Sequence, residues 1–172
     1  MSQQHLRFAL FGNEYQTKKS VAVERTINYL RAHGAELYID RPYYEFLVRQ
    51  SDDEVWCSGV FDDYNFDVDF AISLGGDGTF LRAASRVGAK GIPVLGVNMG
   101  RLGFLSDVLP LEVEKALDEI FEGQYKLEEH TVIKVEAEGE PIEGNPYALN
   151  DIALLKRVDA SMITIRCRVN GE

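Results

Sequence analysis

The stretch FAISLGGDGT, residues 70–79, decides how this chain folds and where its chemistry lies. Its apolar first half predicts a buried strand, and its second half predicts a tight glycine turn. Such a turn can expose backbone N–H groups to phosphate oxygens while it aims the one carboxylate, that of Asp77, at a hydroxyl group. The pattern therefore indicates a phosphoryl-transfer site.

Each residue of the turn has a place in that chemistry. Gly75, Gly76 and Gly78 leave the backbone open to close approach by phosphate, and Thr79 adds a hydroxyl at the start of the next helix. Asp77 can accept a proton from an attacking hydroxyl or hold Mg²⁺. A plain interpretation is also open, in which the turn is structural and its Asp caps a helix. A second glycine-rich strand end follows, and it favours the phosphate site.

That second loop is NMGRLGFL, residues 98–105, at the end of the next apolar run. Adjacent parallel strands would bring it to the same edge of the sheet as the glycine turn. Asn98 can both donate and accept hydrogen bonds, and Arg101 can meet a phosphate. Phe104 either stacks on a base or fills the core. The loop therefore predicts a second wall of the site.

Asn150 and Asp151 interrupt another apolar run, and polar residues inside a buried strand need partners. The partner is either a ribose diol or a structural hydrogen-bond network. The residues alone do not choose between these two interpretations.

Apolar runs and helical periodicity alternate along the first part of the chain. Runs that predict strands cover residues 6–11, 35–39, 69–74 and 92–97. Helical spacing of apolar residues covers residues 20–33, 42–50 and 110–121, and a helix also follows the glycine turn. Strands that alternate with helices indicate an α/β fold with a Rossmann-like parallel sheet, which we assign to a domain of residues 1–123.

The pattern changes to alternation without helices near residue 124. Segments that predict antiparallel strands cover residues 131–137, 147–155 and 163–169. Asn170-Gly171 is a strong hairpin signal, although one residue follows it. We therefore expect residues 124–172 to begin an antiparallel, β-rich second domain that is truncated, in a chain that is a fragment.

The composition limits the classes of partner. The 172 residues carry a formal net charge of −10, which disfavours binding to nucleic acid or to an anionic membrane. Cys57 and Cys167 show no metal-ligand spacing, and no apolar run reaches the roughly 18 residues of a membrane span. Residues 1–5 have neither the basic stretch nor the apolar core of a signal peptide, so we do not expect them to act as one. We expect a cytoplasmic protein. The segment 51–69 has seven acidic residues and no Lys or Arg, which predicts a solvated loop or flap.

Three segments of the chain resemble the motifs of bacterial NAD kinases, the ATP- or polyphosphate-dependent family. They are GGDGTFLRAA at residues 75–84, GVNMGRLGFL at 96–105 and ALND at 148–151, in the order and spacing of the family. The glycine turn alone also resembles turns of phosphofructokinases and of diacylglycerol and sphingosine kinases. The second and third segments are the ones that indicate the NAD kinase family.

The resemblance implies transfer of the ATP γ-phosphoryl to the 2′-hydroxyl of the adenosine ribose of NAD, which gives NADP, with a divalent metal such as Mg²⁺. Asp77 would be the general base on that hydroxyl, and Gly78 would lie against the dinucleotide. Phe104 would pack near the adenine. Asn150 and Asp151 would form hydrogen bonds with the NAD ribose and its surroundings.

Two further residues take roles from the resemblance. Arg82 would add a phosphate or ribose contact, and Ser161 stands where the family has another NAD contact. Family members often carry Asn-Glu where this chain has Asn150-Asp151, so the shorter acid changes the reach of that side chain. The resemblance also implies a dimer or tetramer at full length, and we expect this polypeptide alone to have little kinase activity.

Two other functions stay open from the residues. One is a lipid kinase of the diacylglycerol or sphingosine type, for which segments 98–105 and 150–151 would have no purpose. The other is a catalytically silent, nucleotide-binding regulatory module. Replacement of Asp77 by Asn separates the two, because it would abolish transfer in an enzyme, whereas in a regulatory module it would largely spare ligand affinity.

Overall fold

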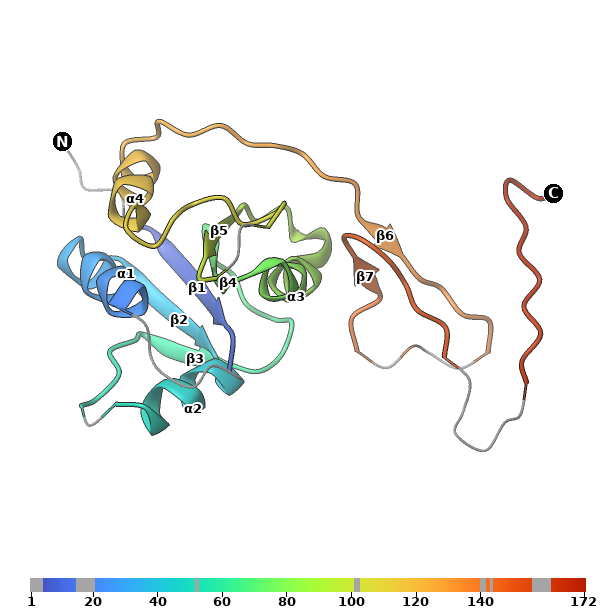
Figure 1. Cartoon of the computed structure of the whole chain (residues 1–172), viewed down its shortest axis with the longest axis horizontal. Coiled ribbons are helices and arrows are strands. Elements are labelled where there is room, and N and C mark those ends of the chain that lie inside the picture. The colour runs from blue at the N-terminus through green and yellow to red at the C-terminus, as the bar shows by residue number, and fades with distance from the viewer. Residues whose placement is uncertain are drawn as a thin grey trace.

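A computed structural model of the chain describes residues 5–14, 21–51, 53–100, 103–139, 142, 144–155 and 162–172. The main sheet and its helices form one body, and a small hairpin lies beside α3 (Figure 1). The elements are β1 (Arg7–Gly12), α1 (Val21–Ala32), β2 (Glu36–Asp40), α2 (Arg41–Arg49), β3 (Gly59–Phe61), β4 (Phe70–Gly75), α3 (Asp77–Val87), the 3₁₀ turn η1 (Gly88–Lys90), β5 (Val94–Asn98), α4 (Val113–Phe121), β6 (Ile133–Lys134) and β7 (Tyr147–Ala148).

The five-stranded sheet has the order β3-β2-β1-β4-β5, and all of its neighbouring pairs are parallel. From β1 the chain moves to β2 on one side, and from β4 it moves to β5 on the other. The order therefore reverses between β1 and β4, and such a switch point opens a crevice at the carboxyl ends of the strands. The predicted α/β fold with a parallel sheet is confirmed.

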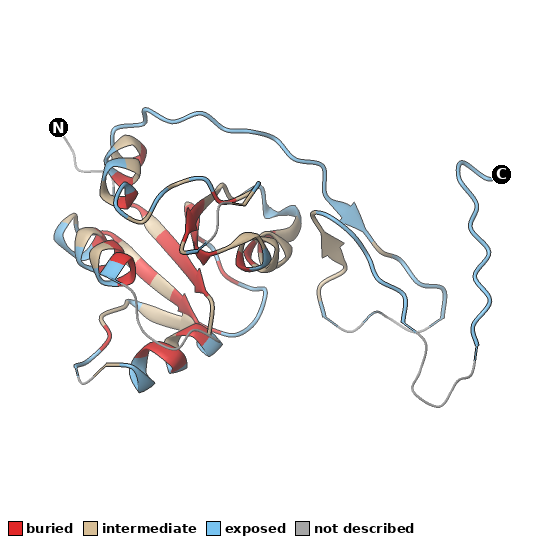
Figure 2. Cartoon of the chain, in the orientation of Figure 1, coloured by how far each residue is buried: buried red, intermediate tan, exposed pale blue. Residues whose placement is uncertain are grey.

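The two faces of the sheet carry separate parts of the core. On β1, Phe8 and Leu10 face the layer that contains α1, α2 and α4, whereas Ala9 and Phe11 face the layer that contains α3. Every residue of β4 is buried, as expected for a central parallel strand that is covered on both sides (Figure 2). The core therefore fixes β4 and, with it, the position of the glycine turn that follows.

The helix boundaries follow local signals. Gly34 has a φ of +69° just after α1, which places the residue in the left-handed region that favours glycine. Pro42 lies in the first turn of α2. The helix predicted from residue 110 begins only at Val113, because the chain first makes a turn in which the Glu112 N–H donates to the Leu109 carbonyl at 2.9 Å. None of the helices in the described ranges has the length and hydropathy of a membrane span.

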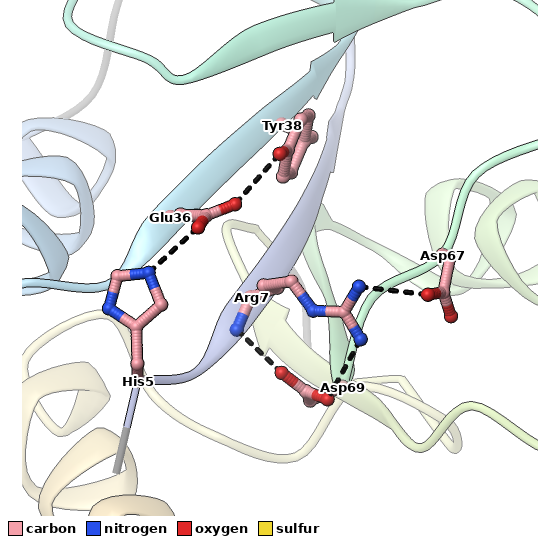
Figure 3. Close-up of polar contacts among 6 residues, drawn as sticks. All are labelled: His5, Arg7, Glu36, Tyr38, Asp67 and Asp69. Carbon is pink, nitrogen blue, oxygen red and sulfur yellow. Dashed lines mark hydrogen bonds and ion pairs between the residues drawn. The ribbon is translucent and has the colours of Figure 1, made fainter. Parts of the chain in front are cut away.

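The acidic segment 51–69 is more ordered than the sequence predicts, because β3 lies within it and pairs with β2. Several of its carboxylates neutralise arginines of the sheet and of α2. Asp67 accepts a hydrogen bond from Arg7 Nη1 at 2.8 Å, and Asp69 accepts one from the Arg7 backbone N–H at 2.7 Å (Figure 3). Asp62 accepts one from Arg41 Nε at 2.7 Å. Three of the acidic residues in this segment therefore have a structural role as partners of arginines.

The second part of the chain forms less sheet than predicted. In the described residues beyond 124, strand pairing joins only Ile133–Lys134 to Tyr147–Ala148, in antiparallel register. The prediction of a strand over 163–169 is therefore wrong. Alternating apolar and polar residues form a strand only where a neighbouring strand completes the backbone hydrogen bonds. The Asn170-Gly171 turn does form, since Val169 and Glu172 exchange backbone hydrogen bonds of 2.8 and 3.1 Å.

The buried centre of β4 yields a prediction about stability. Ile72 has no exposed surface, so Ile72→Ala removes buried methyl groups and leaves a cavity. We expect the free energy of unfolding in urea to fall by about 2–5 kcal/mol, against about 0.5–1.5 kcal/mol for Ile72→Val. A loss below that of Val21→Ala, at a position that is 70% exposed, would contradict this view of the core.

Candidate active site

Three loops meet at the carboxyl edge of the sheet. The glycine turn follows β4, the loop from Met99 to Asp107 follows β5, and Asn13 and Glu14 follow β1. The β4–β5 register pairs Gly75 with Asn98, so the first two loops start side by side. The prediction that these loops share one edge is confirmed.

The Asp77 carboxylate joins the glycine turn to the loop after β5. Its Oδ2 accepts the Phe104 N–H at 2.9 Å and its Oδ1 accepts the Leu105 N–H at 3.0 Å. The Phe104 N–H, and then the Leu105 N–H, lower the pKa of Asp77 below its usual range, because both bonds favour the charged form. Asp77 is therefore a carboxylate at neutral pH, and it anchors the second loop.

Two glycines allow that loop to lie against the sheet. A Cβ on Gly103 would come within 2.6 Å of the Asp77 carboxyl carbon. A Cβ on Gly96 would lie 2.9 Å from the Leu105 carbonyl oxygen and 2.8 Å from the Phe80 ring. Sequence reasoning assigned no role to either glycine, although the glycine content of the loop was the available signal. Their lack of a side chain is what brings the loop to Asp77.

The glycines of the turn differ in what surrounds them. A Cβ on Gly75 would lie 2.6 Å from Cβ of Thr79, so this glycine makes room for the buried Thr79 side chain. A Cβ on Gly76 or Gly78 would meet nothing within 4 Å, and neither residue has a positive φ. The fold therefore requires Gly75, whereas it does not require Gly76 or Gly78.

The two predicted contacts on the second loop have different surroundings. Asn98 is buried, and its Oδ1 accepts the Gly100 N–H at 3.0 Å, so it shapes the start of the loop. The Phe104 side chain is fully exposed at 100%, which makes its alternative role in the core wrong. An aromatic ring held on an anchored backbone is available to stack on a base. Arg101 lies outside the described residues.

A hollow of about 240 Å³ lies at the switch point between β1 and β4. Asn13, Gly78, Thr79 and Arg82 line it. The Arg82 guanidinium donates from Nη2 to the Gly12 carbonyl, and its Nη1 lies 3.4 Å from Glu14 Oε1. The sequence analysis identified Arg82 as a site residue and missed Asn13 and Glu14. These two residues directly follow β1, and ligands of parallel α/β sheets bind at the carboxyl ends of such strands, so their position was the available signal.

The third predicted segment lies apart from Asp77. Asn150 and Asp151 are exposed, and their described hydrogen bond joins Asn150 Nδ2 to Asp151 Oδ1 at 3.4 Å. The preceding strand β7 packs on α3 beyond its first turn, where Ser85 Oγ donates to the Tyr147 carbonyl at 3.1 Å. Within the described contacts, no hydrogen bond joins this segment to the glycine turn. Ser161 lies outside the described residues.

A larger hollow of about 460 Å³ lies at the opposite end of α3. Its cations are already engaged, because Arg86 donates to the Asp63 carbonyl and Lys90 donates to the Tyr64 carbonyl. The Arg86 guanidinium also lies 3.3 Å from the buried Asp40 carboxylate. The two hydrogen bonds to Asp63 and Tyr64 join the acidic segment 51–69 to α3 and η1. We therefore locate the candidate site at the switch point.

The described residues include no group of three or more His, Cys, Asp or Glu side chains placed to hold a metal ion. A protein cage for Mg²⁺ normally offers one or two carboxylates and leaves the remaining positions to water and substrate phosphates. The donor set here does not fit a resident metal held by the protein alone.

Comparison with known proteins decides the family. Residues 8–125 match the family described as the ATP-NAD kinase N-terminal domain. The chain belongs to this family. It is 48% identical over 166 residues to NAD kinase of Bacteroides fragilis and 36% identical over 166 residues to NAD kinase of Porphyromonas gingivalis. Each match covers 96% of this chain and 57% of the relative, so the chain spans little more than half the length of these curated NAD kinases.

The fold also matches a solved structure of the same kind. Yeast NADH kinase complexed with NADH superposes with a TM-score of 0.65 over 84% of this chain and 46% of that chain, at 18% sequence identity. This likeness concerns the fold. The family match and the curated relatives confirm the resemblance that the three sequence segments indicate.

The contact between Gly103 and Asp77 can be tested by adding one methyl group. Gly103→Ala pushes the loop away from the carboxylate, so we expect faster amide hydrogen exchange at Phe104 and Leu105, measured by NMR. Gly100→Ala is the matched control, because a Cβ there would meet nothing within 4 Å. Unchanged exchange of both amides in Gly103→Ala would refute the anchoring role of Asp77.

Proposed function

We propose that the protein is a phosphotransferase that moves the γ-phosphoryl group of ATP to the 2′-hydroxyl of the adenosine ribose of NAD, giving NADP. The observation that carries the proposal is the ionised Asp77 carboxylate, held at the sheet edge where three loops converge. Similarity to curated NAD kinases over 96% of the chain supports the choice of acceptor.

Asp77 acts as the general base on the ribose hydroxyl. A carboxylate offers about four acceptor positions, and the Phe104 and Leu105 N–H groups take one on each oxygen. The remaining positions can receive the hydroxyl hydrogen. A lowered pKa makes Asp77 a weak base, which suits a loose phosphoryl transition state that needs orientation of the attacking oxygen more than early proton removal.

The nucleotide acceptor lies over the glycine turn. Gly76 and Gly78 are not required by packing or by backbone conformation, so a ligand that comes close to the backbone gives their presence a reason. The exposed Phe104 ring stacks on the adenine. We retain Asn150, Asp151 and Ser161 as ribose and dinucleotide contacts, on the strength of the family motif.

The phosphoryl donor lies in the hollow at the switch point. Arg82 supplies a positive charge at its wall, and Gly78 and Thr79, in the first turn of α3, line it as well. The positive end of the helix dipole therefore adds to the attraction for phosphate. ATP or polyphosphate fits this chemistry. Because the protein offers no cage for a metal within its described part, we propose that the divalent cation arrives with the donor phosphates as part of the substrate.

Assembly and location extend the proposal. We propose a cytoplasmic homo-oligomer, a dimer or tetramer at the full length of its relatives, with neither nucleic acid nor membrane as a partner. The net charge of −10 supports the last point, because like charge repels both polyanions. We also propose that residues 1–123 form the α/β domain and that residues 124–172 begin a second, β-rich domain.

The central test is NADP formation by Asp77→Asn. The assay compares the 172-residue chain with a longer form that covers the length of its relatives, each given NAD, ATP and Mg²⁺. In the active form, we expect kcat to fall by about 10²–10⁴-fold while NAD affinity changes much less. Asp53→Asn, at an exposed acid of the segment 51–69, is the control and keeps full activity.

Other acceptors complete that test. Transfer to diacylglycerol or sphingosine, without transfer to NAD, would replace the proposal with a lipid kinase. Nucleotide binding without transfer to any acceptor, and without an effect of Asp77→Asn on affinity, would replace it with a regulatory module.

Gly78 yields an experiment in which stability and function move in opposite directions. Gly78→Ala adds a methyl group in open space within a helix, so we expect the free energy of unfolding to rise by about 0.5–1 kcal/mol. The same methyl group obstructs the ligand, and nucleotide affinity falls by about tenfold or more. Glu45→Ala, an exposed helical substitution on α2, is the control for both measurements. Unimpaired nucleotide affinity in Gly78→Ala would contradict the placement of the ligand.

A further inference from the structure

One side chain of α3, that of Ser85, joins the helix to the β6–β7 hairpin. Among the hydrogen bonds of the described residues, the two that connect α3 with this hairpin both involve Ser85. Its Oγ donates to the Tyr147 carbonyl at 3.1 Å and accepts a hydrogen bond from Asn145 Nδ2 at 3.5 Å. Asn145 Oδ1 accepts the Tyr147 N–H at 3.1 Å. The Ser85 hydroxyl is thus both a donor and an acceptor in a small network.

The end of α3 is shaped to receive the hairpin. Gly88 has a φ of +57°, and a Cβ on it would lie 3.0 Å from Cδ2 of the Tyr147 ring. The strands β6 and β7 have two residues each, and a hairpin of two strands is at best marginally stable by itself. The position of the hairpin therefore depends on its contact with α3.

Ser85 lies on the same face of α3 as Gly78. The two residues are seven positions apart, so they lie nearly two turns and about 10 Å apart along the helix axis. A Cβ on Gly78 would meet nothing within 4 Å. At Ser85 the hairpin lies against the helix (Figure 1). This face is therefore open beside the glycine turn and is covered by the hairpin further along.

The hairpin leads directly to the third predicted segment of the site. Asn150 and Asp151 follow Ala148, the last residue of β7, by two and three residues. An extended chain spans at most about 3.5 Å per residue, so both stay within about 10 Å of Ala148. Both residues are exposed, and their described hydrogen bond is the one between them. The position of β7 therefore limits where these two side chains can reach.

We propose that Ser85 is a positioning residue for the nucleotide acceptor. By holding the hairpin on α3, it keeps Asn150 and Asp151 within reach of a dinucleotide that lies over Gly78. The inference rests on the proposed function, which assigns these contacts to NAD. A hairpin that leaves α3 takes Asn150 and Asp151 with it, so the apparent affinity for NAD falls with the fraction of molecules in which the hairpin is docked.

The donor site does not depend on this contact. The described partners of Arg82 are the Gly12 carbonyl and Glu14, at the end of β1 and just after it. Release of the hairpin from Ser85 leaves these partners in place. We therefore expect the hairpin to affect binding of the acceptor and to spare binding of the donor.

A purely structural role for Ser85 makes a different prediction. In that case Ser85→Ala lowers the free energy of unfolding and leaves the NAD affinity of the folded protein unchanged. Ser58→Ala is the matched control, because Ser58 Oγ also bonds to the backbone, accepting the Leu37 N–H at 3.1 Å. This bond lies beside β2 and β3, at the other end of the sheet from β5.

The test is calorimetric titration of NAD into the longer form of the protein used for the NADP assay. We expect Ser85→Ala to weaken NAD binding by about five- to tenfold, whereas Ser58→Ala leaves it unchanged. In the NADP assay, the KM for ATP changes by less than about twofold in Ser85→Ala. Alanine is a strong helix former, so α3 itself remains intact.

A double-mutant cycle shows whether Ser85 acts through the residues that follow the hairpin. When Asn150 and Asp151 are both replaced by Ala, the contacts that Ser85 positions are gone. Ser85→Ala then weakens NAD binding by less than about twofold further. A general loss of stability would instead add its full effect in either background.

Three results overturn the inference and leave the proposed function standing: unchanged NAD affinity in Ser85→Ala, an equal loss in Ser58→Ala, or full additivity in the double-mutant cycle. If Ser85→Ala does not fold, Asn145→Ala, which removes the same network from the hairpin side, decides by the same criteria. A wild-type longer form that neither binds NAD nor forms NADP overturns the proposed function, and the inference with it.

Discussion

Two backbone hydrogen bonds to the Asp77 carboxylate hold the candidate site together. They join the first residue of α3 to the loop after β5, and they set the position of the exposed Phe104 ring. The bonds exist because Gly103 and Gly96 lack side chains and let the loop lie close. A carboxylate that is ionised, oriented and only partly used as an acceptor is what a hydroxyl nucleophile needs nearby. The chemistry we propose therefore depends on this one anchor.

The sheet order explains why the site lies where it does. The reversal between β1 and β4 sends α1 and α3 to opposite faces, so neither of these two helices covers the crevice between the ends of the two strands. The glycine turn and the Asn13–Glu14 turn then face each other across that crevice. Burial of β4 on both faces keeps the turn from moving relative to the core. The sheet order therefore determines where the glycine turn lies, and the burial of β4 holds it there.

The sequence predicted the features that depend on residues close together in the chain. Apolar runs gave the strands on either side of Asp77, and the glycines marked the turn. It did not predict the hydrogen bonds from the Phe104 and Leu105 N–H groups to Asp77. Such contacts depend on how two loops pack against each other once the sheet has formed. The pairing of β3 in an acidic segment and the short extent of β6 and β7 were missed for a related reason: a strand is defined by its neighbour as much as by its own residues.

The most direct test of the account is an NMR titration of the Asp77 carboxyl together with the amides of Phe104 and Leu105. The two hydrogen bonds favour the charged form, so their contribution to stability is present above the unfolded pKa and is lost as the pH falls through the lower, folded pKa. We expect all three resonances to change together, with a midpoint below the ordinary pKa of an aspartic acid. A midpoint at or above that ordinary value, or amides that do not respond, would contradict the account.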